Sequence, residues 1–174
     1  MRASIVKQGL TRRQLLQNIA ATGGMAVIGA GFIAAPDAAW ALEVTEISEH
    51  DMATLVQMAR DIYPHDRVGD AFYVVAMKGY DTADHKENVA KGVAELDALA
   101  KAAGAEDYLS TQWEDNRVAL LKQIEDSAFF QTVRGGLVTG LYNQKAVWPI
   151  FGYEGESFSK GGYIDRGFND INWL

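Results

Sequence analysis

Apolar residues recur at helical spacing through the middle of the chain, from residue 48 to residue 142. Positions three and four residues apart share one face of an α-helix, so this spacing predicts amphipathic helices. The predicted helices cover Ser48–Ile62, Asp70–Met77, Asp84–Ala103, a stretch from Thr111 to Ile124, and Ser127–Tyr142. No run of alternating residues predicts a strand, and we therefore expect an all-α bundle of about five helices.

Local signals mark where some of these helices begin and end. Ser48 followed by Asp51, and Thr111 followed by Glu114, resemble capping boxes. In a capping box two side chains satisfy N–H groups that the first turn leaves free. Gly104 follows the third helix and is its predicted C-terminal cap.

The composition changes after Gln144, where aromatic residues begin to alternate with glycines. The aromatic residues of this part are Trp148, Phe151, Tyr153, Phe158, Tyr163, Phe168 and Trp173. The stretch follows neither helical nor strand periodicity, yet it is too aromatic for a disordered tail. We expect a helical domain over residues 42–147 and an irregular segment over residues 148–174 that folds over a surface.

The amino terminus has the three zones of a signal peptide. Residues 1–13 carry four basic side chains and no acid, residues 18–35 carry no charge, and small residues then stand at Ala39 and Ala41. Arg12 and Arg13, followed by a polar residue and two leucines, resemble the twin-arginine export motif. We predict that residues 1–41 are a twin-arginine signal peptide and that the folded chain is exported to the periplasm. A retained membrane anchor and an ordinary buried helix are the alternatives.

Removing residues 1–41 takes away four of the 16 basic residues and one of the 23 acidic residues, which leaves a net charge of −10. An acidic surface argues against nucleic acid as a partner, because phosphates are bound by Lys and Arg. It suits a basic protein partner. The chain has no cysteine, which excludes disulfides, covalent c-type haem attachment and thiolate iron–sulfur ligation.

Few residues suggest chemistry within the chain itself. His65 next to Asp66 is the most suggestive pair, because an Asp can orient a His ring, but no second His lies at metal-ligand spacing. A surface or loop-fixing role for His65 is therefore favoured over a metal site. The acids of the C-terminal segment are Glu154, Glu156, Asp165 and Asp170. They suggest either a glycosidase pair or, as we prefer, ion pairs with Arg166 as the natural partner. No nucleophile elbow, phosphate loop or dinucleotide fingerprint is present.

Three parts of the mature chain carry a family resemblance. They are Asp61–Asp66, the residues Phe129, Phe130, Val133 and Arg134, and above all the C-terminal stretches Trp148–Ser157 and Lys160–Trp173. Together they resemble the gluconate 2-dehydrogenase subunit 3 family, the small or gamma subunits of membrane-associated dehydrogenases. The resemblance covers most of residues 47–174, and the twin-arginine signal matches it. One departure is Asn169, where we would expect an acidic residue.

The resemblance implies a non-catalytic small subunit that serves the export, assembly and stability of a larger partner. That partner would be an FAD-containing flavoprotein of the glucose–methanol–choline type, which oxidises a sugar, a sugar acid or another alcohol. A multi-haem c-type cytochrome is a possible third subunit, and the complex would lie at the outer face of the inner membrane. No catalytic, cofactor-binding or metal-binding residue is expected in this chain, and the twin-arginine translocase would be a transient partner.

Aromatic side chains are favoured anchors at interfaces because each buries a large area at low entropic cost. We expect the residues Trp148, Tyr153, Tyr163, Arg166, Phe168 and Trp173 to form the interface with the flavoprotein. Two alternatives stay open at this point. The segment could pack on the chain's own helices, and the chain could be an independent periplasmic enzyme or small-ligand-binding protein.

Overall fold

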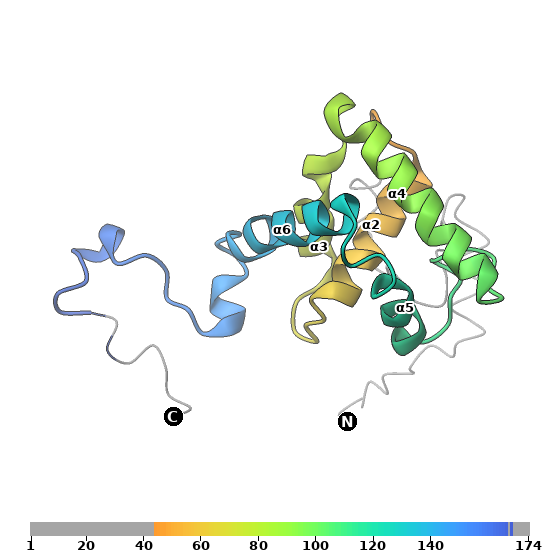
Figure 1. The fold of residues 1–174 in the computed structure, drawn as a ribbon. Helices are drawn as coiled ribbons and strands as arrows, with labels where there is room; N and C mark the ends of the chain where they lie inside the picture. The colour runs from red at the N-terminus through yellow and green to blue at the C-terminus, as the bar shows by residue number, and fades with distance from the viewer. Residues whose placement is uncertain (1–43, 167, 169–174) are drawn as a thin grey trace, which may run out of the picture.

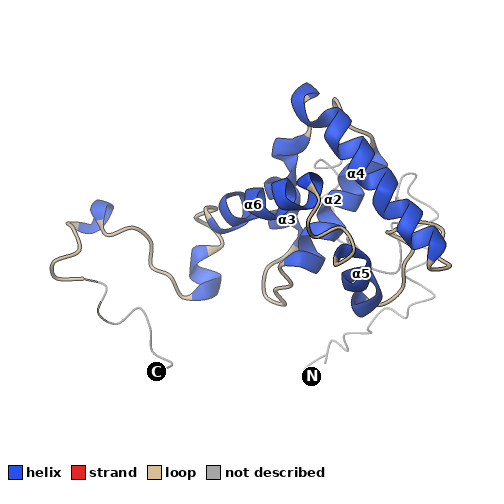
Figure 2. Cartoon of the chain, viewed as in Figure 1, coloured by secondary structure: helices blue, strands red, loops and turns tan. Residues whose placement is uncertain are grey.

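Five α-helices and three short 3-10 turns make up the part of the chain that the computed structural model describes, residues 44–166 and 168 (Figures 1 and 2). The helices are α2 (Glu49–Ile62), α3 (Asp70–Met77), α4 (Ala83–Ala102), α5 (Glu114–Leu121) and α6 (Ala128–Tyr142). The 3-10 turns are η2 (Lys78–Tyr80), η3 (Trp148–Phe151) and η4 (Phe158–Lys160). No strand occurs in these described residues, so the all-α prediction is confirmed.

Helix α2 lies at the centre of the bundle and contacts α3, α4, α5 and α6. A helix surrounded by others is buried on most sides rather than along one stripe. Accordingly, side chains from every face of α2 are buried, among them Met52, Leu55, Val56 and Met58. The other helices each add one apolar face, and together they form a single continuous core.

Local capping explains where α2 and α6 begin. The Ser48 hydroxyl accepts a hydrogen bond from the N–H of Asp51, and the Asp51 carboxylate accepts one from the N–H of Ser48, so this capping box is confirmed. The Ser127 hydroxyl accepts a hydrogen bond from the N–H of Phe130 at the start of α6. At the end of α4 the backbone of Gly104 takes a positive φ of 93°, which glycine adopts at little cost.

The predicted capping box at Thr111 and Glu114 is wrong. Helix α5 begins at Glu114, and its N-cap is Trp113, with a φ of 67° and no capping side chain. The Thr111 hydroxyl instead donates to the carbonyl of Asp107, because the loop before α5 turns back on itself. Trp113 is 76% exposed rather than part of the core, and Ile124 is buried beyond the end of the helix.

Glycines allow α6 to lie very close to its neighbours. A Cβ atom on Gly140 would stand 3.2 Å from the backbone carbonyl oxygen of Ala76 on α3, and one on Gly136 would overlap the hydroxyl of Tyr80. On α4, a Cβ on Gly92 would lie 2.1 Å from Cγ of Phe129, a buried residue of α6. These positions therefore fix the direction of α6, the helix from which the C-terminal segment departs (Figure 1).

Candidate functional site

The C-terminal segment leaves the helical body at the end of α6 and runs away from it, as the blue part of Figure 1 shows. Its first part is anchored. The indole Nε1 of Trp148 donates to the carbonyl oxygen of Tyr142 at 2.8 Å, and the Gln144 side chain donates to the carbonyl oxygen of Phe72 on α3 at 2.8 Å. Val147 is fully buried between these contacts. Residues 143–151 thus form a fixed base for the segment.

His65 belongs to this base. Its Nε2 lies 2.7 Å from the hydroxyl of Tyr142, and its ring meets the edges of Tyr142 and Phe151, with centroids 5.6 Å and 5.0 Å away. Burial, followed by the nearby charge of Arg60, lowers the pKa of His65, while Asp66 opposes this shift. The hydrogen-bond partner of the ring is the Tyr142 hydroxyl, which fits the loop-fixing role that the sequence favours for this histidine. His65 therefore ties the loop after α2 to the root of the C-terminal segment.

Beyond the base, residues 154–166 form a loop whose two ends are joined by charged side chains; we call it the closed loop. Nη2 of Arg166 lies 2.7 Å from Oε2 of Glu154. Nζ of Lys160 donates to the carbonyl oxygen of Glu154 and lies 3.7 Å from its carboxylate. Glu156, which is also part of the loop, pairs at 3.2 Å with Lys145, which lies outside it. The acids Glu154 and Glu156 thus form ion pairs, as we preferred over a glycosidase pair.

The apolar side chains of the segment are exposed rather than packed on the helices. Phe158 is 93% exposed, Tyr163 78%, Ile164 78% and Phe168 82%. Soluble chains rarely expose contiguous apolar patches unless these bind something. Trp148 differs because it is half-buried. Its ring centroid lies 5.2 Å from that of Tyr153, and the ring lies against Gly155.

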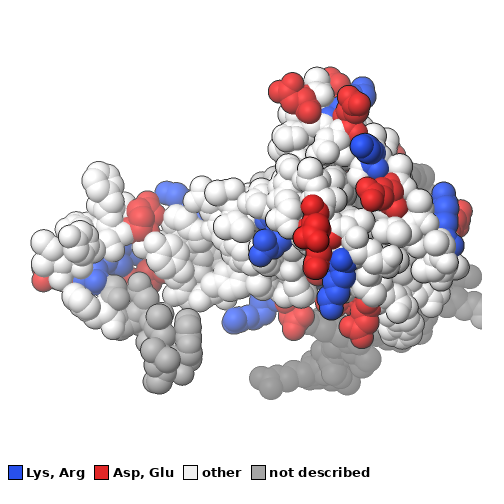
Figure 3. Space-filling view, in the orientation of Figure 1, with Lys and Arg blue, Asp and Glu red and all other residues white. Residues whose placement is uncertain are grey.

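Charge is distributed unevenly between the helical body and the segment. Between residues 128 and 153 the only charged residues are Arg134 and Lys145, and there is no acid. In the face drawn in Figure 3, charged side chains gather over the helical body and again at the far end of the segment, and the part between them is mostly uncharged. Residues 127–153 are therefore the longest stretch of the described chain without an acid.

Two buried carboxylates were not identified from the sequence as important residues. Asp61 of α2 accepts hydrogen bonds from the guanidinium of Arg117, at 2.7 and 2.8 Å, from the hydroxyl of Tyr108 at 2.7 Å, and from the Gln57 side chain. Burial and the Asp61 charge raise the pKa of Tyr108 well above its usual value. The hydrogen bond to Asp61 raises the pKa of Arg117. All these groups serve to join α2 to α5 and to the loop before it.

Asp81 holds the start of the described chain. Its carboxylate accepts from the backbone N–H groups of Thr45, Glu46 and Ile47 at 2.8–3.1 Å and from Nζ of Lys78 at 3.0 Å. Burial disfavours the charged form, but the hydrogen bonds from the three backbone N–H groups and from Lys78 outweigh it and hold the pKa of Asp81 well below its usual range. This carboxylate is therefore a structural anchor.

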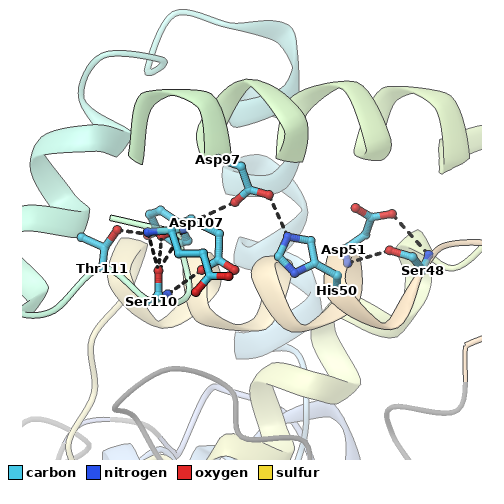
Figure 4. A network of polar contacts seen from close by, with 9 residues as sticks. Ser48, His50, Asp51, Asp97, Asp107, Ser110 and Thr111 are labelled. Atoms are coloured by element: carbon cyan, nitrogen blue, oxygen red, sulfur yellow. Dashed lines mark hydrogen bonds and ion pairs between the residues drawn. The ribbon is translucent and has the colours of Figure 1, made fainter. Parts of the chain in front are cut away.

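A third polar network contains a His–Asp pair, which is two of the three members of a hydrolytic triad. Nε2 of His50 lies 2.7 Å from Asp97, and the other oxygen of Asp97 accepts from the N–H of Tyr108 (Figure 4). The serines of this network are used as caps: Ser48 caps α2, and Ser110 accepts from the N–H of Asp107. The arrangement joins α2, α4 and the loop after α4.

The described residues hold neither a metal-binding cluster nor a membrane-spanning helix. Residues 44–166 and 168 contain no group of three or more His, Cys, Asp or Glu side chains that could hold a metal ion. No described helix has the length and apolar character needed to cross a membrane. The signal-peptide residues Arg12, Arg13, Ala39 and Ala41, and the predicted anchor Trp173 with Asn169, lie outside the described residues.

Comparisons of the chain with protein-family models, with curated proteins and with solved structures find no match in any of the three. The C-terminal segment, with its fixed base, its closed loop and its exposed aromatic side chains, is the candidate functional site.

Proposed function

We propose that this chain is the non-catalytic small subunit of a periplasmic FAD-dependent dehydrogenase complex, and that its C-terminal segment binds the flavoprotein subunit. The partner is of the glucose–methanol–choline type and oxidises a sugar, a sugar acid or another alcohol. A multi-haem c-type cytochrome accepts the electrons. The small subunit itself binds no cofactor and serves the export, assembly and stability of the flavoprotein.

The observation that carries the proposal is the exposure of the aromatic side chains on a segment that is itself anchored. Phe158, Tyr163 and Phe168 are at least 78% exposed, although they follow a base that is hydrogen-bonded to the helical body and held by the buried Val147. An aromatic surface held in place without a covering is typical of a protein–protein interface. The same segment carries the resemblance to the small subunits of dehydrogenases.

The predicted interface residues take two different roles in this proposal. Tyr163 and Phe168 supply most of the exposed contact area, and Tyr153, with an exposed fraction of 43%, adds to it. Trp148 uses its indole N–H within the chain, so its contribution is to hold the base. Trp173, which lies outside the described residues, is a further predicted anchor.

Export follows from the same proposal. Arg12 and Arg13 address the chain to the twin-arginine translocase, which moves folded proteins, and cleavage occurs after Ala41. A flavoprotein must fold around FAD in the cytoplasm, so a partner without its own signal can cross the membrane attached to this chain. The complex then lies at the outer face of the inner membrane.

The test is to express the full-length chain with a C-terminal tag in its native host and to purify it from the periplasmic and membrane fractions. We expect a larger, yellow protein with bound FAD to co-purify. A colourless chain recovered alone would contradict the proposal, and a ligand-induced shift in its melting temperature would then favour the independent binding protein.

Two variants decide whether the segment makes the contact. Replacing both Tyr163 and Phe168 by Ala should weaken the association by about 2–4 kcal/mol, because buried aromatic anchors dominate interface energies. The matched control is Trp113→Ala, which removes an equally exposed aromatic side chain, 76% exposed, from the helical body. Equal retention of the flavoprotein by the double variant and the control would show that the segment is not the interface.

A further inference from the structure

The closed loop has a definite shape although it contacts little of the helical body. Glu154 at its start and Arg166 at its end are joined by an ion pair of 2.7 Å, and Lys160 from the middle of the loop reaches back to Glu154. Inside the loop, the N–H of Gly162 donates to the carbonyl oxygen of Ser157 at 2.8 Å. A loop whose ends and middle are tied in this way loses less conformational entropy when it binds.

Glycines set the turns of the closed loop. Gly155, Gly161 and Gly162 all have positive φ angles, of 98°, 92° and 99°. A Cβ atom added at Gly161 or Gly162 would meet nothing within 4 Å. Glycine is therefore needed at these two positions for its backbone conformation and not for lack of space.

The apolar side chains of the closed loop are unusually exposed. Compact surface loops of this size are ordinarily packed by their own side chains. Here Phe158, Tyr163 and Ile164 are at least 78% exposed, while Lys160 and Arg166 both pair with Glu154 inside the loop. Because Arg166 already has Glu154 as its counter-charge, it does not require an acidic side chain on the partner surface. An uncharged, apolar groove is the surface that fits these side chains.

We propose that the closed loop is formed before binding and inserts Phe158, Tyr163 and Ile164 into an apolar groove of the flavoprotein subunit, with Glu154, Arg166, Gly161 and Gly162 as positioning residues. The inference rests on the proposed function for the identity of the partner. It changes the role of Arg166, which we expected from the sequence to contact the partner directly. In the proposed loop Arg166 acts through Glu154 by holding the two ends together.

The decisive experiment is a charge exchange in the full-length chain, with retention of the FAD-containing partner as the measurement. Glu154→Gln and Arg166→Gln should each weaken the association about two- to fivefold, the range expected for one partly exposed ion pair. The exchange Glu154→Arg with Arg166→Glu, made together with Lys160→Gln so that no second cation lies beside position 154, restores the pair in reverse and should bind within about twofold of Lys160→Gln alone. If Arg166 instead contacts the partner, Glu154→Gln will have no effect and the exchange will bind no better than Arg166→Gln, which would overturn the inference.

The glycines provide a second test with a matched control. Gly161→Ala and Gly162→Ala add only a methyl group in open space, but each forces an L-residue into a left-handed conformation and should weaken binding about five- to thirtyfold. Gly104→Ala imposes the same backbone cost, at a φ of 93° and also with nothing within 4 Å, but on the helical body. It should leave retention of the partner unchanged. Equal effects of all three variants would overturn the inference.

A measurement without the partner separates this inference from the proposed function. Trypsin cleaves after Lys160, which the closed loop ties to Glu154, so Glu154→Gln should make this cleavage faster in the chain alone. An unchanged cleavage rate would overturn the preformed loop even if the flavoprotein co-purifies. If the wild-type chain retains a flavoprotein and the positioning variants retain it equally well, the proposed function stands and the closed loop is not its positioning device.

Discussion

The ion pair between Asp61 and Arg117 makes a strong prediction about stability. Its two hydrogen bonds measure 2.7 and 2.8 Å, and the side chains are only 3% and 17% exposed. Replacing Arg117 by Met keeps most of the apolar volume but leaves the Asp61 carboxylate buried without its counter-charge. Breaking a buried pair in this way costs about 3–5 kcal/mol. Asp61 keeps its hydrogen bonds from Tyr108 and Gln57, so we expect the lower end, about 3 kcal/mol.

The assay is urea unfolding of the chain without residues 1–41, followed by circular dichroism. A domain of this size is stabilised by roughly 5–15 kcal/mol in total, so a loss of about 3 kcal/mol moves the midpoint clearly. Tyr108→Phe, which removes only one hydroxyl donor, should cost less than Arg117→Met. The double variant Asp61→Leu with Arg117→Met removes both charges and should be less destabilised than Arg117→Met alone. A loss below about 1 kcal/mol for Arg117→Met, or simple additivity in the double variant, would refute the reasoning.

Two further predictions concern acid stability and close packing. The pKa of Asp81 lies below its value in the unfolded chain, so the stabilisation that its carboxylate provides is complete above about pH 5 and is lost as the pH falls below about 4. Between pH 6 and pH 3 the melting temperature of Asp81→Asn should therefore fall less than that of the wild type. Parallel curves of melting temperature against pH would contradict this. Gly92→Ala should destabilise the domain by about 1–3 kcal/mol because the new methyl group overlaps the ring of Phe129. Gly135→Ala, on the same urea assay, should stabilise it by about 0.5–1 kcal/mol because its site is open and alanine favours a helix; opposite signs at the two glycines are the expected result.

Most helices of this protein could be predicted from the sequence because their signals are local. The apolar spacing and the Ser48–Asp51 pair place α2, and Ser127 places the start of α6. The predicted start of α5 is wrong, because Thr111 and Glu114 have the right spacing for a capping box. The competing acceptor, the carbonyl of Asp107, becomes available to the Thr111 hydroxyl only when the loop folds back.

The candidate site could be predicted in part. Its aromatic and glycine-rich composition identified the C-terminal segment, and the acids near Arg166 suggested ion pairs. Two of the contacts that anchor the segment could not be predicted, because their partners lie far away in the chain. His65 reaches Tyr142 across 77 residues, and Gln144 reaches Phe72 across 72.

Local patterns in the sequence predict the helical class, most helix boundaries, the acidic charge and the position of the aromatic segment, because these depend on periodicity, capping and composition over a few neighbouring residues. Folding alone brings Asp61 to Arg117 and Asp81 to residues 45–47, and it leaves Phe158 and Tyr163 exposed while Trp148 is held in the base. These outcomes depend on how the helices pack against α2. A buried carboxylate takes whichever partner that packing brings within hydrogen-bonding distance, and the local sequence around it carries no information about a partner that is distant in the chain.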